Sequence, residues 1–362
     1  MRLEQLTFTR FIAAVAIVVY HFGSGAYPFN IESIGFIMWN ANLGVSYFFI
    51  LSGFIMVVAY SSSGQIKVGS YLKNRFARIY PVFFLSIILL LAHTYFFDPN
   101  FTIGIFKHAI FNLSLLQAWV PSKAMLFNGP AWSLSVEVLF YLIFPYFFNK
   151  FYTKQKLSIV VGSIVVFWLL FQILFQYLVK SPFNEGYPSA SHALLFYFPL
   201  MHLSAFLAGN AAGVFFMKKL AGRTGRYDIP VILTIVVFLV IIKMHTGLNY
   251  HNGLLAAVII PFIIFLSLNR GLISRFFRLK FLVFLGEISY GIYILQVPVM
   301  RLTVSIVRQL DITHDNAYLF YISLAMLIVV SALSYYFFET PVRNIIKSIR
   351  LKPLKLDDAQ SS

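Results

Sequence analysis

An arginine and a histidine stand within one apolar segment near the start of the chain, TFTRFIAAVAIVVYHFG. Arg10 and His21 are eleven residues apart, which is almost a whole number of α-helical turns. A straight helix would therefore place both side chains on one face, about 16 Å apart. Charge inside an apolar helix is costly and normally faces a bundle interior or a watery cavity. The pair predicts one wall of such a cavity, and snorkelling of Arg10 with a hydrogen-bonded core histidine is the structural alternative.

A basic cluster, SYLKNRFARIYP at 70–81, leads into the third long apolar segment. Arg75 and Arg78 stand at positions i and i+3 of an expected helix, so both side chains can reach one anion. Two arginines at this spacing suit a phosphate or pyrophosphate. Spacing alone leaves an alternative open, in which the cluster is a basic loop that touches lipid headgroups.

An acidic residue, Glu137, lies deep within the apolar segment GPAWSLSVEVLFYLIFP at 129–145. A Gly-Pro pair breaks the chain at the expected membrane edge, and Trp132 follows at interface depth. In the topology derived below, Glu137 reaches a depth comparable with that of His21. A carboxylate beside a histidine can fix its tautomer and raise its basicity. A buried structural pair is the alternative for Glu137.

The other polar residues within apolar segments indicate structural roles. Glu287, in LGEISYGIYILQ, is expected at the level of Arg10 and would neutralise it, while Glu339 and Arg343 form an i, i+4 pair. The remaining histidines have no metal-ligand spacing to a second ligand, and the chain has no cysteine, so we expect neither a metal site nor a thiolate nucleophile. The serine in FFILSGF lacks the context of a nucleophile elbow.

Membrane helices must position these charges, because the composition excludes an ordinary soluble domain. Of the 362 residues, 60% are hydrophobic and 11% are charged, and the mean hydropathy is +0.82. Soluble domains are roughly 25% charged. A soluble fold cannot hide this much apolar surface, so lipid must solvate much of it. The net charge of +16 comes from basic residues between apolar segments rather than from one nucleic-acid-binding face.

Apolar segments of about 20 residues predict spanning helices. We expect an all-α polytopic bundle of about ten transmembrane helices, at 6–26, 36–60, 79–98, 131–149, 157–178, 193–217, 229–244, 253–268, 281–303 and 316–338. The stretch 101–120 is also apolar, but it contains Lys107, His108, Asn112 and Gln117. We interpret it as a broken or surface-lying external helix.

This topology places 22 of the 28 lysine and arginine residues on one side. Basic loops mark the cytoplasmic side, so both termini are predicted to be cytoplasmic. The first apolar segment is long enough to span and no cleavage site follows it, so we expect an uncleaved span rather than a signal peptide. One membrane domain over 1–345 and a short cytoplasmic tail over 346–362 are predicted.

In this order, these features resemble the acyltransferase 3 family of integral membrane acyltransferases. The matching pieces extend from Leu3 to Arg343. They are Arg10 and His21 with ten residues between them, GVSYFFILSGF at 44–54, RFARIYP at 75–81, AWSLSVE at 131–137 and LGEISYGIYIL at 285–295. Each piece alone is weak, but their order and spacing are specific. Some members carry an extra extracytoplasmic domain, and this chain resembles the stand-alone members.

The resemblance implies an O-acyltransferase of the bacterial cytoplasmic (inner) membrane. Acyl-CoA, most simply acetyl-CoA, would be a cytosolic co-substrate rather than a permanently bound cofactor. The acceptor would be a hydroxyl of a cell-envelope polysaccharide or glycolipid, and a homo-oligomer is left open. The implied functional residues are His21, Glu137 with Trp132 beside it, and the arginines Arg10, Arg75 and Arg78. We expect His21 and Glu137 to be catalytic and the arginines to bind the donor. The candidate positioning residues are Trp132, Ser52, Tyr80 and Glu287.

Two positions depart from the family pattern. Gln296 stands where relatives often have a histidine, and Ser46 stands where they often have an acidic residue. These departures put in doubt any scheme that needs a second histidine or a carboxylate there.

The expected mechanism uses His21, oriented by Glu137, as a general base for attack of the acceptor hydroxyl on the thioester. A transient acyl-histidine is a second route. A transporter or flippase of envelope glycans is the rival from another class, but such proteins usually show inverted repeats, and none is visible. A membrane glycosyltransferase would need acidic residues in its first external loop, which offers only Glu32.

Overall fold

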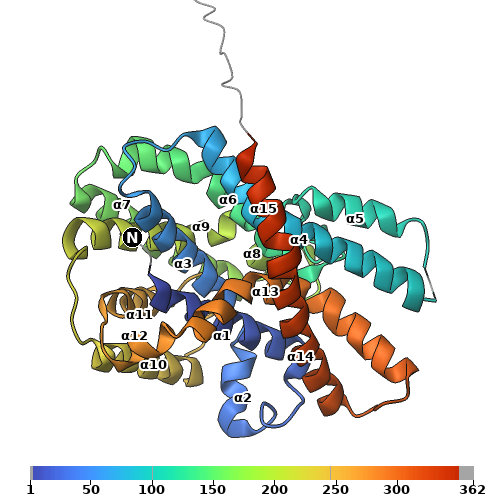
Figure 1. The fold of residues 1–362 in the computed structure, drawn as a ribbon. Helices are drawn as coiled ribbons and strands as arrows, with labels where there is room; N and C mark the ends of the chain where they lie inside the picture. Colours follow the sequence, from blue (N-terminus) through green and yellow to red (C-terminus); the bar gives the residue numbers. More distant parts are fainter. Residues whose placement is uncertain (1–2, 100, 245, 350–362) are drawn as a thin grey trace, which may run out of the picture.

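The structure is a computed structural model that describes residues 3–99, 101–244 and 246–349 as a bundle of helices (Figure 1). Within these ranges, eight helical segments are long and apolar enough to cross a membrane. They are Glu4–Gly23, Leu43–Tyr60, Val68–Phe97, Gly129–Tyr152, Leu157–Lys180, Ala190–Leu220, Lys280–Gln309 and Asn316–Ser348. The described residues form no strand beyond an isolated bridge between Gly225 and Asn269. The expected fold class, an all-α polytopic membrane bundle, is confirmed.

Several of these segments are interrupted by tighter or wider turns. The first consists of η1 (Glu4–Leu6), α1 (Thr7–Val18) and the π-helical turn η2 (Val19–Gly23), and the next two are α3 (Leu43–Tyr60) and α4 (Val68–Phe97). The fourth consists of η5 (Gly129–Ala131), α6 (Trp132–Phe147) and η6 (Phe148–Tyr152), and the fifth is α7 (Leu157–Lys180). The sixth consists of α8 (Ala190–Tyr197), η7 (Pro199–His202), α9 (Leu203–Phe215) and η8 (Phe216–Leu220). The last two are α13 (Lys280–Gln309) and the series α14 (Asn316–Ser334), η9 (Tyr335–Glu339) and α15 (Thr340–Ser348).

Two further expected spans form shorter helices. The segments predicted at 229–244 and 253–268 become α10 (Asp228–Lys243) and α11 (Ala256–Leu268), with 16 and 13 residues. A helix needs about 20 residues to cross a bilayer without help from its neighbours. The predicted tail at 346–362 lies outside the described residues from position 350 onward.

Short helices occupy the connections between the spans. The stretch 101–120 is broken, as expected, into α5 (Ile105–Leu113) and η3 (Gln117–Trp119), followed by η4 (Pro121–Lys123). Neither piece is long enough to cross the membrane. The other connecting helices are α2 (Glu32–Trp39) and α12 (Leu272–Phe277).

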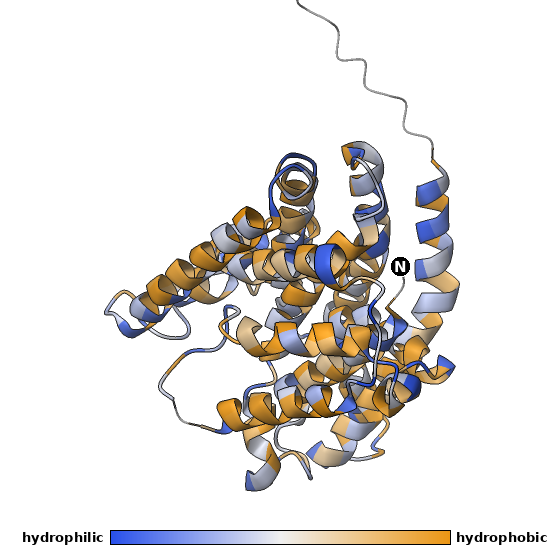
Figure 2. Ribbon diagram, turned by 90° about the vertical axis from the view of Figure 1, so that its left-hand side faces the viewer, coloured by the Kyte–Doolittle hydropathy of each residue, from blue (hydrophilic) through white to orange (hydrophobic). Residues whose placement is uncertain are grey.

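The bundle is organised around α13, which contacts α1, α4 and α14, while α3 packs against α9 (Figure 1). By contrast, α7 exposes most of its apolar side chains, as a helix does when it faces lipid at the edge of a bundle. Figure 2 shows hydrophobic residues along the helices and hydrophilic residues in the connections and in α15. This distribution is that of a protein solvated by lipid around its middle.

Glycine allows the central helices to approach very closely. A Cβ atom added to Gly209 of α9 would lie 2.0 Å from the carbonyl oxygen of Ile50 in α3, and one added to Gly53 would lie 2.2 Å from that of Phe206. A Cβ atom added to Gly286 of α13 would likewise lie 2.0 Å from the carbonyl oxygen of Thr7 in α1. Lipid tails are as apolar as the side chains, so helices in a membrane gain stability through this close packing.

We expect Gly209→Leu to lower the free energy of unfolding by about 3 kcal/mol or more, because the side chain would have to displace the backbone of α3. Gly162→Leu in α7 is the matched control, because nothing lies within 4 Å of a Cβ at Gly162. Thermal unfolding of both variants in detergent measures the difference. Equal stability of the two variants would contradict the close approach of α3 and α9.

Candidate active site

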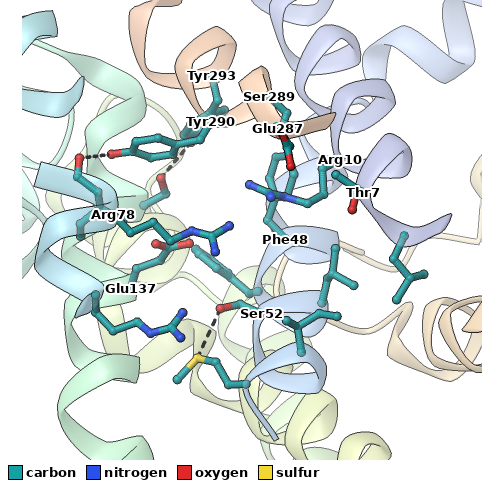
Figure 3. Close-up of a pocket in the computed structure, with 18 of the residues that line it drawn as sticks. Thr7, Arg10, Phe48, Ser52, Arg78, Glu137, Glu287, Ser289, Tyr290 and Tyr293 are labelled. Carbon is teal, nitrogen blue, oxygen red and sulfur yellow. Dashed lines mark hydrogen bonds between the residues drawn. The ribbon is translucent and has the colours of Figure 1, made fainter. Parts of the chain in front are cut away.

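A cavity of about 450 Å³ opens between α1, α3, α4, α6, α13 and the segment from α14 to α15 (Figure 3). Its charged lining residues are Arg10, Arg75, Arg78, Arg343, Glu137, Glu287 and Glu339. All but Glu137 lie on parts of these helices that are predicted to be nearer the cytoplasm, and Glu137 was expected at the depth of His21. With four arginines against three glutamates, the cavity keeps one positive charge in excess for an anionic ligand.

The two arginines of α4 have different surroundings. Arg75 lies over the faces of Tyr60, Tyr71 and Tyr141, with its guanidinium carbon 5.8, 5.5 and 5.8 Å from the ring centres. Such contacts hold a cation in place without neutralising it. Arg78, one turn further along, is exposed to the cavity, and Figure 3 shows its guanidinium group pointing toward that of Arg10.

Lys73, the other basic residue of this turn, has a structural role instead. Its ammonium group donates hydrogen bonds of 2.7 Å to the carbonyl oxygens of Lys347 and Ile349. Both carbonyls lie at the C-terminal end of α15, where a cation is favourable. The basic cluster thus divides into two arginines at the cavity and one lysine that caps a helix.

Glu137 lies among the arginines and not beside His21. Its carboxylate accepts a hydrogen bond of 2.7 Å from the hydroxyl of Tyr141, one turn later in α6. It lines the cavity together with Arg10 and Arg78 (Figure 3). The expected orientation of His21 by Glu137 is therefore wrong, because the carboxylate faces the arginines that its charge compensates.

The two remaining glutamates also have tyrosine or arginine neighbours. Glu287 accepts a hydrogen bond of 2.8 Å from Tyr335 and lines the same cavity as Arg10, the residue that it was expected to neutralise. Arg343 lies 3.3 Å from Glu339, which confirms the predicted i, i+4 pair. The pair lines the cavity, so it belongs to the site and is more than a local surface contact.

His21 lies in the π-helical turn η2, at the opposite end of the first span from the arginines. It is exposed and is not among the residues that line the cavity. Of the predicted pair, only Arg10 therefore lines the cavity. His21 lies beyond it, in a wider turn of the same span.

The partner of His21 is Gln296, the residue that departs from the family pattern. Their side chains meet at 2.8 Å, between Nδ1 of His21 and Oε1 of Gln296. The amide nitrogen of Gln296 donates a hydrogen bond of 2.6 Å to the carbonyl oxygen of Tyr293, which fixes the amide so that its oxygen faces the imidazole. An oxygen can only accept, so Nδ1 of His21 carries the hydrogen and Nε2 carries the lone pair of a base.

Tyr293 joins this pair to the cavity. Its ring lines the cavity, its hydroxyl donates to the carbonyl oxygen of Pro130 at 3.1 Å, and its own carbonyl holds Gln296. Phe48 packs edge to face on the same ring, with 6.0 Å between the ring centres. One residue of α13 thus borders the charged cavity and also holds the partner of His21.

The predicted positioning residues divide between the cavity and its surroundings. Ser52 lines the cavity. Trp132 is buried against His202, with 4.9 Å between ring centres, and is not among the lining residues. Tyr80 points away, toward the carbonyl oxygen of Leu113 at 3.3 Å, because two residues of helix turn it about 200° from Arg78.

Sequence reasoning missed the tyrosines of the site. Tyr141, Tyr290, Tyr293 and Tyr335 all line the cavity. The signal for Tyr141 was its spacing of four residues from Glu137, which places both on one helical face. Among the residues that the structure describes, no three His, Asp or Glu side chains gather as metal ligands.

The fold and the cavity define a multi-pass membrane protein that holds arginines, glutamates and tyrosines in its interior. A family model described as an acyltransferase domain matches residues 3–336. The chain therefore belongs to the acyltransferase 3 family. No solved structure matches it.

Curated relatives extend the comparison. The chain is 25% identical to the peptidoglycan O-acetyltransferase OatA of Listeria monocytogenes, over 92% of this chain and 54% of the relative. It is 23% identical to the O-acetyltransferase OatA of Staphylococcus aureus, over 92% of this chain and 56% of the relative. The chain thus spans about half the length of these relatives. It is also 27% identical to a putative acetyltransferase of Acidianus two-tailed virus, over 81% of each chain.

We expect His21 to be protonated at Nδ1 in its neutral form, because the oxygen of Gln296 accepts from that atom. In Gln296→Leu this preference should disappear. Nitrogen NMR of histidine-labelled protein in detergent distinguishes the two tautomers, and His21→Ala assigns the signal. A neutral His21 that carries its hydrogen on Nε2 in the unmodified chain would contradict the arrangement.

Proposed function

We propose that this protein transfers an acyl group, most simply acetyl, from cytosolic acyl-CoA to a hydroxyl of a cell-envelope glycan. The observation that carries the proposal is the separation of two kinds of chemistry along the first span. An arginine-lined cavity lies at the predicted cytoplasmic end, and a histidine with a free Nε2 lies at the other. Family membership and the O-acetyltransferase relatives support the same reaction class.

The donor would bind through its phosphates at the arginines. Arg75 and Arg78 line one space, and Arg10 faces Arg78 from α1. Arginine suits phosphate because two parallel N–H groups can contact two oxygens. Arg343, which sequence reasoning placed only in a local pair, adds a fourth guanidinium group to the lining. The pantetheine arm would extend along α1, past Phe48 and Tyr293, toward His21.

His21 would act as the general base at the far end of this path. The acceptor hydroxyl would attack the thioester carbonyl carbon while Nε2 of His21 takes the hydroxyl proton. The C–S bond then breaks, and the proton passes from His21 to the departing thiolate. Gln296 would perform the task expected of Glu137, because its oxygen fixes the tautomer that leaves Nε2 unprotonated.

Glu137 would keep a different role in this scheme. It would compensate the arginines when no donor is bound and hold Tyr141 against Arg75. Charges in a low-dielectric interior need a partner in every state of the protein. The acceptor would arrive from outside the bacterial cytoplasmic membrane, and the names of the relatives favour a cell-wall glycan.

We expect His21→Ala to lower acyl transfer from labelled acetyl-CoA into membrane glycan at least 100-fold, because a positioned base typically contributes 10²–10⁴-fold. His108→Ala is the matched control, since His108 is exposed and lies outside the cavity. The assay uses membranes that contain the full chain. Near-normal transfer by His21→Ala would rule out this mechanism.

We expect Arg75→Ala and Arg78→Ala to raise the KM for acetyl-CoA about 10- to 100-fold, because a hydrogen bond to a charged group contributes about 1.5–3 kcal/mol. Arg308→Ala, at an exposed position beyond both the cavity and His21, should leave the KM unchanged. Initial rates at varied donor concentration provide the measurement. An effect on acceptor use alone would remove these arginines from the donor site.

A further inference from the structure

A second hollow, of about 640 Å³, lies between α2 and the segment that follows α10. We name it the outer pocket, because both of its walls are predicted to be extracytoplasmic. Its lining residues are Glu32, Phe36, Trp39, Asn40, Asn42, Leu43, Phe196, Ile242, Lys243, Met244, Thr246, Gly247, Leu248, Asn249, Tyr250 and His251. Its wall α2 contacts η2, the turn that carries His21.

The outer pocket presents amide groups that keep free hydrogen-bonding capacity. Asn40 donates to the carbonyl oxygen of Phe36 at 2.8 Å, which leaves its own amide oxygen free. The oxygen of Asn249 accepts from the backbone N–H of His251 at 3.0 Å, which leaves its amide nitrogen free. Asn42, half-buried, makes no side-chain hydrogen bond to any described residue. Free amide oxygens and nitrogens in one pocket favour a ligand that both donates and accepts hydrogen bonds.

His251 is held at the inner end of this pocket by a second histidine–amide pair. Its Nδ1 lies 2.7 Å from Oδ1 of Asn252, whose amide nitrogen donates to the carbonyl oxygen of Leu195 at 2.9 Å. As in the pair of His21 and Gln296, the amide oxygen must accept, so Nδ1 carries the hydrogen. Nε2 is left as an acceptor, and no hydrogen bond to it from a described side chain or backbone group is formed.

The imidazole of His251 is nearly enclosed, since the residue is only 8% exposed. Burial lowers its pKa, which keeps the ring neutral and Nε2 unprotonated at neutral pH. Because Nδ1 is occupied by Asn252 and Nε2 is an acceptor, an O–H group that enters the pocket can donate a hydrogen bond to Nε2.

The aromatic wall narrows the class of ligand. Trp39 exposes 68% of its surface. Trp39 and Phe36 both belong to α2 and both line the outer pocket. The outer pocket contains one carboxylate and one ammonium, and the ammonium of Lys243 lies 5.7 Å from the ring centre of Phe36. Balanced charge, several amides and an exposed indole are suited to the hydroxyls and apolar face of a neutral sugar rather than to an anion.

We infer that the outer pocket binds a neutral sugar unit of the acceptor glycan, with Nε2 of His251 accepting a hydrogen bond from a sugar hydroxyl. The inference rests on the proposed function, because it supplies the acceptor site of that reaction. The contact between α2 and η2 places the pocket beside the turn of His21, so a neighbouring sugar unit of the same glycan would present its hydroxyl to the base.

The absence of cysteine from the sequence allows a clean test by labelling. Trp39→Cys creates the single thiol of the protein inside the outer pocket, and Phe96→Cys creates a matched one at a side chain that is 73% exposed and lines neither cavity. Intact cells that express each variant are treated with a bulky maleimide that cannot cross membranes. Isolated membranes then report transfer from labelled acetyl-CoA into glycan, and the purified chain reports acetyl-CoA binding.

We expect complete labelling of Trp39→Cys to lower glycan acylation at least tenfold, about 1.4 kcal/mol, while acetyl-CoA binding stays unchanged. Labelled Phe96→Cys should keep the activity of its unlabelled form. Full transfer after complete labelling of Trp39→Cys would overturn the outer pocket as acceptor site. Labelling only in inverted membranes would also overturn it, because the pocket would then face the cytoplasm.

A second variant tests the histidine without reference to labelling. His251→Leu removes the acceptor atom. We expect it to lower glycan acylation at least tenfold and to leave the KM for acetyl-CoA unchanged. Normal glycan acylation by His251→Leu would contradict the proposed hydrogen bond between a sugar hydroxyl and His251. Failure of the unmodified chain to acylate any glycan would instead overturn the proposed function itself, so the two failures are distinguishable.

Discussion

The constraint on which the structure depends is the cost of charge in an apolar interior. Four arginines line one cavity, and three glutamates and a set of tyrosines surround them. Each isolated charge would be strongly unfavourable there, so the cations persist only because carboxylates and aromatic faces stand beside them. The helices that supply these groups must be held close together, which explains why glycine stands where α9 meets α3 and where α13 meets α1.

Outside the charged cavity, two histidines have neutral partners. His21 and His251 each pair with an amide rather than a carboxylate, and each amide is fixed by a backbone carbonyl. An amide oxygen orients an imidazole as a carboxylate does, but adds no further charge to the interior. In the cavity the opposite choice holds, because carboxylates there have cations to compensate. Carboxylates therefore stand where arginines need compensation, and amides stand beside the two neutral histidines.

Much of the fold could be predicted because lipid imposes simple rules. Length and apolarity located most of the spans, and the stretch 101–120, interpreted as a broken helix, is divided into α5 and η3. The i, i+3 spacing of Arg75 and Arg78 brought both to one cavity. The errors have a common source, which is side-chain direction. Depth along the spans placed Glu137 near His21, but the side chain of Glu137 turns toward Tyr141 and the cavity instead.

Tyr293 has a consequence for how the two ends of the site communicate. Its ring borders the charged cavity, and its carbonyl oxygen holds the amide of Gln296, which in turn holds His21. A ligand that displaced this ring would also pull on the backbone that supports the imidazole, within a single helical turn of α13. In the proposed reaction, occupancy of the cavity and alignment of His21 would then be linked. Such a linkage would favour one order of substrate binding without any moving domain.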